Sequence, residues 1–169
     1  MLSDILTVCY GKDHKRLDDG EIPCYGSGGI IRYVNEALYS GESVLIPRKG
    51  SLNNVLYICK PFWTVDTMFY THLTRPNVAK FVYFTMRDLD LAGMNVGSAV
   101  PSMTTAVLNA LEIALPSDDI LASFEETVGP MFLQMQANNS ESARLAALRD
   151  ALLPKLMSGE LSVADIDAK

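Results

Sequence analysis

The segment PRKGSLNN carries side chains that are well suited to contact a nucleic acid. The guanidinium of Arg48 can donate two hydrogen bonds to guanine or to a phosphate, and Lys49 can neutralise a phosphate. Asn53 and Asn54 each offer the donor and acceptor pair that reads adenine, and Ser51 adds a hydroxyl. The same residue types are common in solvated turns, so contact and turn remain alternative interpretations of this segment.

A basic cluster and a small polar loop provide further candidates. Lys12, Lys15 and Arg16 can contact phosphates, although nearby aspartates offset part of their charge. A solvated face is the alternative for this cluster. The loop NVGS offers Asn95 and Ser98, whose short polar side chains suit a groove wall.

The glycine-rich segment YGSGGII has the composition of a phosphate-binding loop but not the spacing. It contains neither G-x-G-x-x-G nor a Gly-Lys-Ser/Thr sequence after a four-residue spacer. A tight turn with a positive φ that enters a strand accounts for its glycines. The other interpretation is that Ser27 and the neighbouring amides contact a phosphate.

Side chains for catalysis or metal binding are sparse. A Ser-His-Asp triad would need His14 or His72 with Ser27 and Asp66, and nothing in their spacing supports it. The three cysteines are scattered and form no C-x-x-C, so neither a disulfide framework nor a zinc site is indicated. We therefore expect no catalytic residue and no metal ligand.

The composition fits one hydrophobic core with an appended element, because the chain has 169 residues of which 49% are hydrophobic. It has no run of about 18 apolar residues, and its start lacks the pattern of a signal peptide. We expect a soluble, cytoplasmic protein with no membrane partner. The formal net charge of -6 weighs against nucleic-acid binding. However, residues 1–60 are neutral, and from residue 117 onward nine acids face four bases, so the acidity is mostly C-terminal.

Before Pro116 the sequence alternates short apolar runs with turns, which is typical of strands around one core. Phe62 and Trp63 have the character of core residues. We expect an α+β fold, with a strand-rich domain over residues 1–116. The predicted elements are strands at 44–46, 55–58, a half-buried strand at 67–73, a helix at 78–89, a helical turn at 104–110 and a closing strand at 111–115.

After Ser117, an N-cap residue, acids and strong helix formers predict a long helix over residues 117–160, followed by a tail at 161–169. Gly129-Pro130 predicts a kink or a restart. One helix face repeats at the 4-3-4-3 spacing of paired helices and is too long for a domain of this size to cover, so it needs another helix. We call this face the helix seam; its expected interface residues are Phe124, Val128, Met131, Met135, Asn138, Ser142, Leu145, Leu148 and Leu152.

Four blocks of the sequence carry a family resemblance: IPCYGSGGIIRYVNEALYSGESVLIPRKGSLNNV, KPFWTVDTMFY, NVGSAVPSMTTAVLNALEIALPS and NNSESARLAALRDALLPKLMSGEL. In this order they closely resemble the DNA-specificity subunits of type I restriction-modification systems. The resemblance implies a target-recognition domain that reads double-stranded DNA, with Ser27 and its neighbours near the DNA backbone, followed by the family's conserved helical region. It also implies modification and restriction subunits as partners, which bind S-adenosylmethionine and ATP, so the chain itself would need no cofactor and would be noncatalytic.

One recognition domain with one helical region is half of the usual subunit of this family, which carries two of each. The resemblance therefore implies a half-subunit that forms a homodimer through an antiparallel or coiled-coil-like helix pair and reads a bipartite inverted repeat. A fragment, or one member of a split pair, is an alternative. A different class of function is a structural or regulatory half-subunit that pairs with another specificity or modification subunit without reading DNA.

Overall fold

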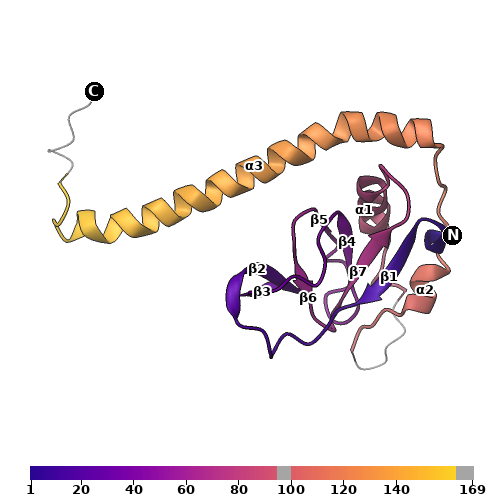
Figure 1. Cartoon of the computed structure of the whole chain (residues 1–169), viewed down its shortest axis with the longest axis horizontal. Helices are drawn as coiled ribbons and strands as arrows, with labels where there is room; N and C mark the ends of the chain where they lie inside the picture. Colours follow the sequence, from indigo (N-terminus) through magenta and orange to yellow (C-terminus); the bar gives the residue numbers. More distant parts are fainter. Residues whose placement is uncertain (95–99, 163–169) are drawn as a thin grey trace. The chain divides into compact units, whose positions relative to one another are not determined.

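The computed structural model describes residues 1–94 and 100–162 and has the expected α+β architecture (Figure 1). The chain divides into two compact units: the first unit, Met1–Glu125, and the second unit, Glu126–Lys169. The elements in chain order are a 3-10 helix at Leu2–Asp4, then β1 (Leu6–Tyr10), β2 (Asp19–Gly26), β3 (Gly29–Val34), β4 (Ser43–Pro47), β5 (Leu56–Ile58), β6 (Trp63–Thr64), β7 (Met68–Leu73), α1 (Ala79–Asp88), α2 (Thr105–Asn109) and α3 (Asp118–Met157).

Strand β4 is an inner strand of the larger sheet, and its sequence SVLIP is buried at all five positions. It pairs antiparallel with β5 and β7, and β7 pairs antiparallel with β1, which gives a sheet of order β1-β7-β4-β5. The second sheet has the order β3-β2-β6, with β2 antiparallel to β3 and parallel to β6. The strands predicted from the apolar runs of β4, β5 and β7 are confirmed.

Neighbouring side chains of β4 and β7 face two different core clusters, because successive residues of a strand point to opposite faces. Ile46 and Phe69 belong to the cluster that α1 covers with Val82 and other apolar residues. Leu45 and Met68 belong to a second cluster around the buried Phe62. The half-buried pattern predicted for residues 67–73 therefore applies only towards the end of β7, since Met68 is buried on the other face as well.

Two predictions about local structure are wrong. Residues 111–115 form no strand: Leu111 accepts a hydrogen bond from the backbone amide of Leu2, but their alternation reflects an extended segment packed on the core without a paired neighbour. Of the kink or restart predicted at Gly129-Pro130, the restart is wrong, because α3 continues through Pro130 to Met157. A proline already has a helical φ, so the surrounding helix formers accommodate the one hydrogen bond that it removes.

The second unit is the remainder of α3 and the turn that ends it. Gly159 adopts a left-handed φ of 76° and donates its amide hydrogen bond to Leu156, which is how glycine commonly terminates a helix. Large apolar side chains remain exposed along this part of α3, among them Leu145 at 50% and Met157 at 80%. Within the described part of the chain, no helix is long and apolar enough to cross a membrane.

The first two turns of α3 are anchored to α1 by a buried lysine. The side chain of Lys80 is only 4% exposed, and its Nζ lies 2.6 Å from Glu125 Oε1 and 3.1 Å from Glu42 Oε1. Tyr57 donates a short hydrogen bond to Glu42 and places its ring 5.0 Å below the ammonium group. Burial alone would lower the pKa of Lys80, but its hydrogen bonds to Glu125 and Glu42 outweigh burial and raise that pKa above its ordinary value.

We expect Lys80→Ala to lower the free energy of unfolding by about 3 kcal/mol, because it leaves two partly buried carboxylates without their shared cation. Chemical denaturation followed by circular dichroism measures this loss, with the exposed Lys60→Ala as control. Since the pKa of Lys80 is raised, its contribution is complete at neutral pH and is lost only as the pH rises through the folded-state pKa. Equal stability of the two variants would contradict the anchoring role.

Candidate nucleic-acid interface

The strand registers bring the main candidate loops to one end of the first unit. Tyr10, the last residue of β1, lies opposite Phe69, and Pro47, the last residue of β4, lies opposite Met68. The ends of β2 and β6 also lie side by side, and β6 leads directly into β7. The chain therefore leaves β1, β2, β4 and β6 at the same place, which we call the loop end and define as residues 11–17, 26–29, 48–54 and 65–67.

The loops of the loop end are packed tightly against one another. A Cβ on Gly11 would lie 2.1 Å from the Val65 carbonyl oxygen, so glycine is required for this close approach. Gly50 has a φ of 82°, and a Cβ there would lie 3.2 Å from Ser27 Oγ. The predicted turn with positive φ in YGSGGII is confirmed at Gly29, whose φ is 118°.

Arg48 and Lys49 extend from the β4–β5 loop towards the same acidic residue. The Arg48 guanidinium donates a 3.0 Å hydrogen bond to the Asp66 carbonyl oxygen, and Lys49 Nζ lies 3.2 Å from Asp66 Oδ2. The aromatic ring of Tyr10 lies 5.3 Å from the guanidinium carbon. Both cations are partly exposed, so they remain accessible while their positions are restricted.

The predicted polar ligands near Arg48 mostly hold the loops together. Asn54 Nδ2 donates to the Ser27 carbonyl oxygen at 2.8 Å, and Asn53 Oδ1 accepts from the Ala92 amide at 3.2 Å. These bonds occupy groups that would otherwise read adenine, whereas the side chain of Ser51 is exposed. Adenine reading by Asn53 and Asn54 remains a prediction, but the structure gives each side chain a second task.

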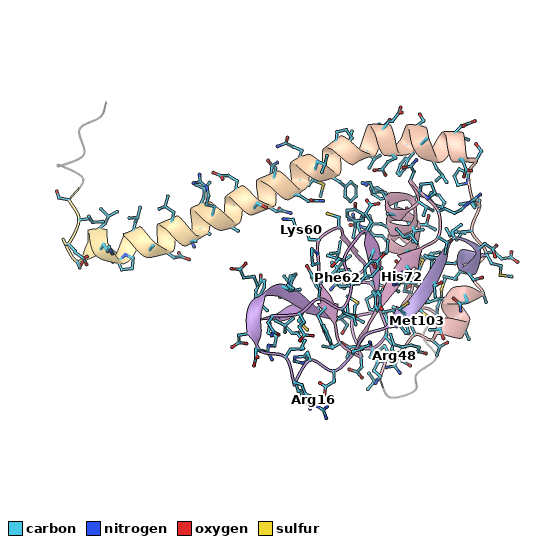
Figure 2. The ribbon with its side chains drawn as sticks, viewed as in Figure 1. Arg16, Arg48, Lys60, Phe62, His72 and Met103 are labelled. Carbon is cyan, nitrogen blue, oxygen red and sulfur yellow. The ribbon has the colours of Figure 1, made fainter. Side chains whose placement is uncertain are left out.

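The basic cluster of the β1–β2 loop is attached to the same region. The Lys12 amide donates to the Thr64 carbonyl oxygen at 2.8 Å, and the Lys12 carbonyl accepts from Trp63 Nε1 at 3.0 Å. Lys15 and Arg16 are exposed, and neither they nor Lys12 forms an ion pair with any residue that the structure describes. In Figure 2 the labelled side chains Arg16 and Arg48 lie at the lower edge of the first unit.

Two candidates fall outside the described residues: Asn95 and Ser98. The structure in turn adds Asp66 and Thr67 to the loop end and places Tyr10, the last residue of β1, beside it; the sequence indicated none of the three as a ligand-binding residue. Their proximity to Arg48 depends on the register of β1, β4 and β7, and no local pattern in the sequence encodes that register.

The arrangement of the titratable groups gives no support to catalysis. Within residues 1–94 and 100–162, no group of three His, Cys, Asp or Glu side chains could hold a metal ion. In the same residues neither histidine is hydrogen-bonded to Ser27 or Asp66; His72 packs on the ring of Tyr39 with centroids 4.4 Å apart. Burial raises the pKa of the Cys24 thiol, which keeps it neutral rather than nucleophilic.

Residues 2–120 match the family described as Type I restriction modification DNA specificity domain. The chain is 33% identical over 142 residues to the type I restriction enzyme HindI specificity subunit of Haemophilus influenzae, a match that covers 83% of this chain and 26% of that protein. It is 32% identical over 151 residues to the MjaIX specificity subunit of Methanocaldococcus jannaschii, covering 89% and 33%.

Solved structures share the fold. A type I restriction-modification S subunit from M. genitalium matches with a TM-score of 0.64 at 20% identity, over 92% of this chain and 44% of that one. The HsdS subunit from Thermoanaerobacter tengcongensis matches with a TM-score of 0.53 at 14% identity, over 95% and 44%. The strand-rich domain followed by a long helix is thus a specificity-subunit fold. The chain belongs to the family of type I restriction-modification DNA specificity subunits, and it spans about a quarter to a third of the length of the curated relatives it matches.

We expect Gly11→Ala to lower the free energy of unfolding by about 1–3 kcal/mol. The added Cβ would overlap the Val65 carbonyl and push the loops apart. Gly28→Ala is the matched control, since a Cβ there meets no atom within 4 Å. Chemical denaturation of both variants measures the difference. Identical unfolding curves would show that the close approach of the loops is not required.

Proposed function

We propose that this chain is a noncatalytic DNA-recognition module that reads one half-site of a bipartite target through its loop end. The observation that carries the proposal is the convergence of two basic loops there, one with Lys12, Lys15 and Arg16 and one with Arg48 and Lys49. Cations placed around a loop cluster can anchor phosphates while a few side chains reach base edges. The names of the specificity subunits that this chain resembles support the same role.

The role of each predicted ligand follows from its surroundings. The exposed cations of the β1–β2 loop suit phosphate contacts, because they are free to follow a DNA backbone and have no acidic partner among the described residues. The hydroxyl groups of Ser27 and Ser51, at the same end of the first unit, suit hydrogen bonds to the DNA backbone. The restrained guanidinium of Arg48 suits a base edge, where geometry decides between sequences.

The second part of the proposal is that α3 supplies the pairing surface for a second half-site. At about 100° per residue, Met131, Met135, Ser142, Leu145 and Leu152 lie within roughly a third of the helix circumference. The four apolar members of this group are between 38% and 59% exposed. A second copy of the helix would bury this seam and produce an inverted repeat of recognition domains.

Other seam residues have partners within the chain, which narrows the proposed interface. Phe124 packs edge-on against Phe84 of α1, with ring centroids 6.2 Å apart, and Val128 is half-buried. Asn138 accepts a 2.8 Å hydrogen bond from Gln134 one turn earlier. The proposed contact is therefore carried mainly by Met131, Met135 and the leucines from Leu145 to Leu152.

In this proposal the chemistry belongs to partner subunits. Modification and restriction subunits would bind S-adenosylmethionine and ATP, while this chain supplies sequence specificity and needs no cofactor. The net charge of -6 favours a second candidate function, in which the chain pairs with another specificity or modification subunit and regulates assembly without reading DNA. Sequence selection by the assembled complex separates the two functions.

We expect Leu145→Asp to convert a dimer into a monomer, because it places a charge within the apolar seam. Ala147→Asp is the matched control, since it adds the same charge on the opposite side of the helix. Light scattering over a concentration series measures the mass of each variant. A wild-type chain that is monomeric at every concentration, or a mass unchanged by Leu145→Asp, would contradict pairing through this seam.

We expect Arg48→Ala to weaken binding to the preferred DNA sequence by about 1–3 kcal/mol. The measurement uses the chain together with the modification subunit of its system, since that partner is expected to complete the grip on DNA. Arg75→Ala is the control, because Arg75 also pairs with an aspartate, Asp118, but both residues lie outside the loop end. Unchanged affinity of the Arg48 variant would remove this residue from the interface.

A further inference from the structure

Asp66 lies inside the loop end, and its acidic side chain has no role in phosphate binding. Its side chain is 64% exposed, and its Oδ2 atom lies 3.2 Å from Lys49 Nζ and 3.9 Å from the Arg48 guanidinium. Its Oδ1 atom has no hydrogen-bond partner among the residues that the structure describes. An exposed carboxylate repels phosphates, so a surface that bound only DNA backbone would be better without it.

The Arg48 guanidinium beside this carboxylate is restrained before any ligand arrives. One nitrogen donates to the Asp66 carbonyl oxygen at 3.0 Å, and the ring of Tyr10 lies 5.3 Å from the guanidinium carbon. Tyr10 is in turn held by Phe69, with ring centroids 5.1 Å apart, and its hydroxyl lies 3.4 Å from Thr105 Oγ1. A guanidinium has five N–H donors, so most of them remain for a ligand.

A fixed donor next to a free acceptor matches one base pair better than the others. Across the major groove, a G·C pair presents two neighbouring acceptors, guanine N7 and O6, followed by the donor at cytosine N4. O6 and N4 are joined by the pair's own hydrogen bond and lie about 2.9 Å apart, so the protein groups that contact them must be neighbours too. The Arg48 guanidinium and the Asp66 carboxylate are such neighbours, because Arg48 Nη1 lies 3.9 Å from Asp66 Oδ2, the other oxygen of the carboxylate that carries Oδ1. An A·T pair instead places its donor between two acceptors and offers an arginine no adjacent acceptor pair.

We propose that Arg48 and Asp66 together read one G·C base pair in the major groove. Arg48 donates to guanine N7 and O6, and Asp66 Oδ1 accepts from cytosine N4. Lys49 stays beside Asp66 Oδ2 and holds the carboxylate in place. This assignment rests on the proposed function, because it requires the loop end to lie against DNA, and it makes Asp66 a specificity-determining residue.

The test begins with selection from randomised double-stranded DNA by the chain in complex with its modification subunit. Comparison with Arg48→Ala identifies the G·C pair whose preference depends on Arg48. At that pair, N4-methylcytosine replaces the outward N–H of cytosine with a methyl group, and 7-deazaguanine removes the guanine N7 acceptor. We expect each analogue to weaken wild-type binding by roughly 5- to 100-fold, the range for a specific base contact.

Each penalty should disappear in only one variant. The N4-methylcytosine penalty should be lost in Asp66→Ala but kept in Arg48→Ala, and the 7-deazaguanine penalty should be lost in Arg48→Ala. A residue that merely supports Arg48 would not abolish the cytosine penalty selectively. Asp118→Ala and Arg75→Ala are the matched controls, because this second Arg–Asp pair lies outside the loop end. Both controls should keep both penalties.

Four other results would overturn the assignment. Asp66→Ala could strengthen binding equally on all sequences and keep the cytosine penalty, which would make Asp66 a counter-ion only. Arg48→Ala could relax an A·T pair, or no pair, in the selection. A wild-type complex that selects no sequence would refute the proposed function itself. In contrast, a wild-type sequence preference that Asp66→Ala leaves unchanged would refute only the G·C assignment. Thermal unfolding of each variant checks that the fold is intact.

Discussion

Thr67 joins the loops on which the candidate interface depends. Its carbonyl oxygen accepts the backbone amides of Arg48 and Lys49 at 2.9 and 3.3 Å, and its hydroxyl accepts the amide of Ser27 at 3.3 Å. One residue at the entrance of β7 thus fixes the β4–β5 loop and the β2–β3 turn together. Because backbone groups make most of these bonds, the side chains of the loops stay available for contacts with a ligand. Exposed side chains of these loops can therefore be substituted without breaking the backbone hydrogen bonds that hold the loops together.

The buried Lys80 performs a comparable task for the helix. A charge that is 4% exposed is costly unless it is fully paired, and Lys80 is compensated by Glu42, Glu125 and the face of Tyr57. An apolar contact, such as that of Phe84 with Phe124, allows two helices to slide, whereas an ammonium group requires its acceptors at fixed positions. We regard the ion cluster as the element that specifies how the first turns of α3 pack on α1. If the ion cluster has this role, unfolding should become less cooperative when the cluster is removed.

The sequence predicts secondary structure correctly where the spacing of apolar residues reflects a buried face. It does not predict which distant segments of the chain come together. The apolar runs of β4 and β7 and the three- and four-residue steps of α1 each record one buried face. The alternation at 111–115 records burial equally well, but a strand also needs a neighbour, and periodicity says nothing about pairing. The continuous helix through Pro130 likewise shows that a local breaker is overridden by favourable sequence on both sides. For the loop end, the basic residues were recognised by type, but the positions of Asp66 and Tyr10 beside Arg48 follow only from strand register.

The distribution of charge is compatible with the proposed DNA-reading surface on an acidic chain. Residues 1–60, which supply most of the loop end, carry seven basic and seven acidic residues, whereas the chain from residue 117 carries most of the net negative charge. Residues 1–116, with ten basic and eleven acidic residues, are nearly neutral and generate little long-range attraction for DNA. In the proposed function, contacts within a few ångströms must therefore decide which sequence is bound. The ion pairs of Arg48 and Lys49 with Asp66 also reduce non-specific attraction, because Asp66 balances part of their positive charge before any DNA binds. Weak attraction to DNA in general would leave the sequence-dependent contacts as the larger share of binding, which is the property that the proposed recognition function requires.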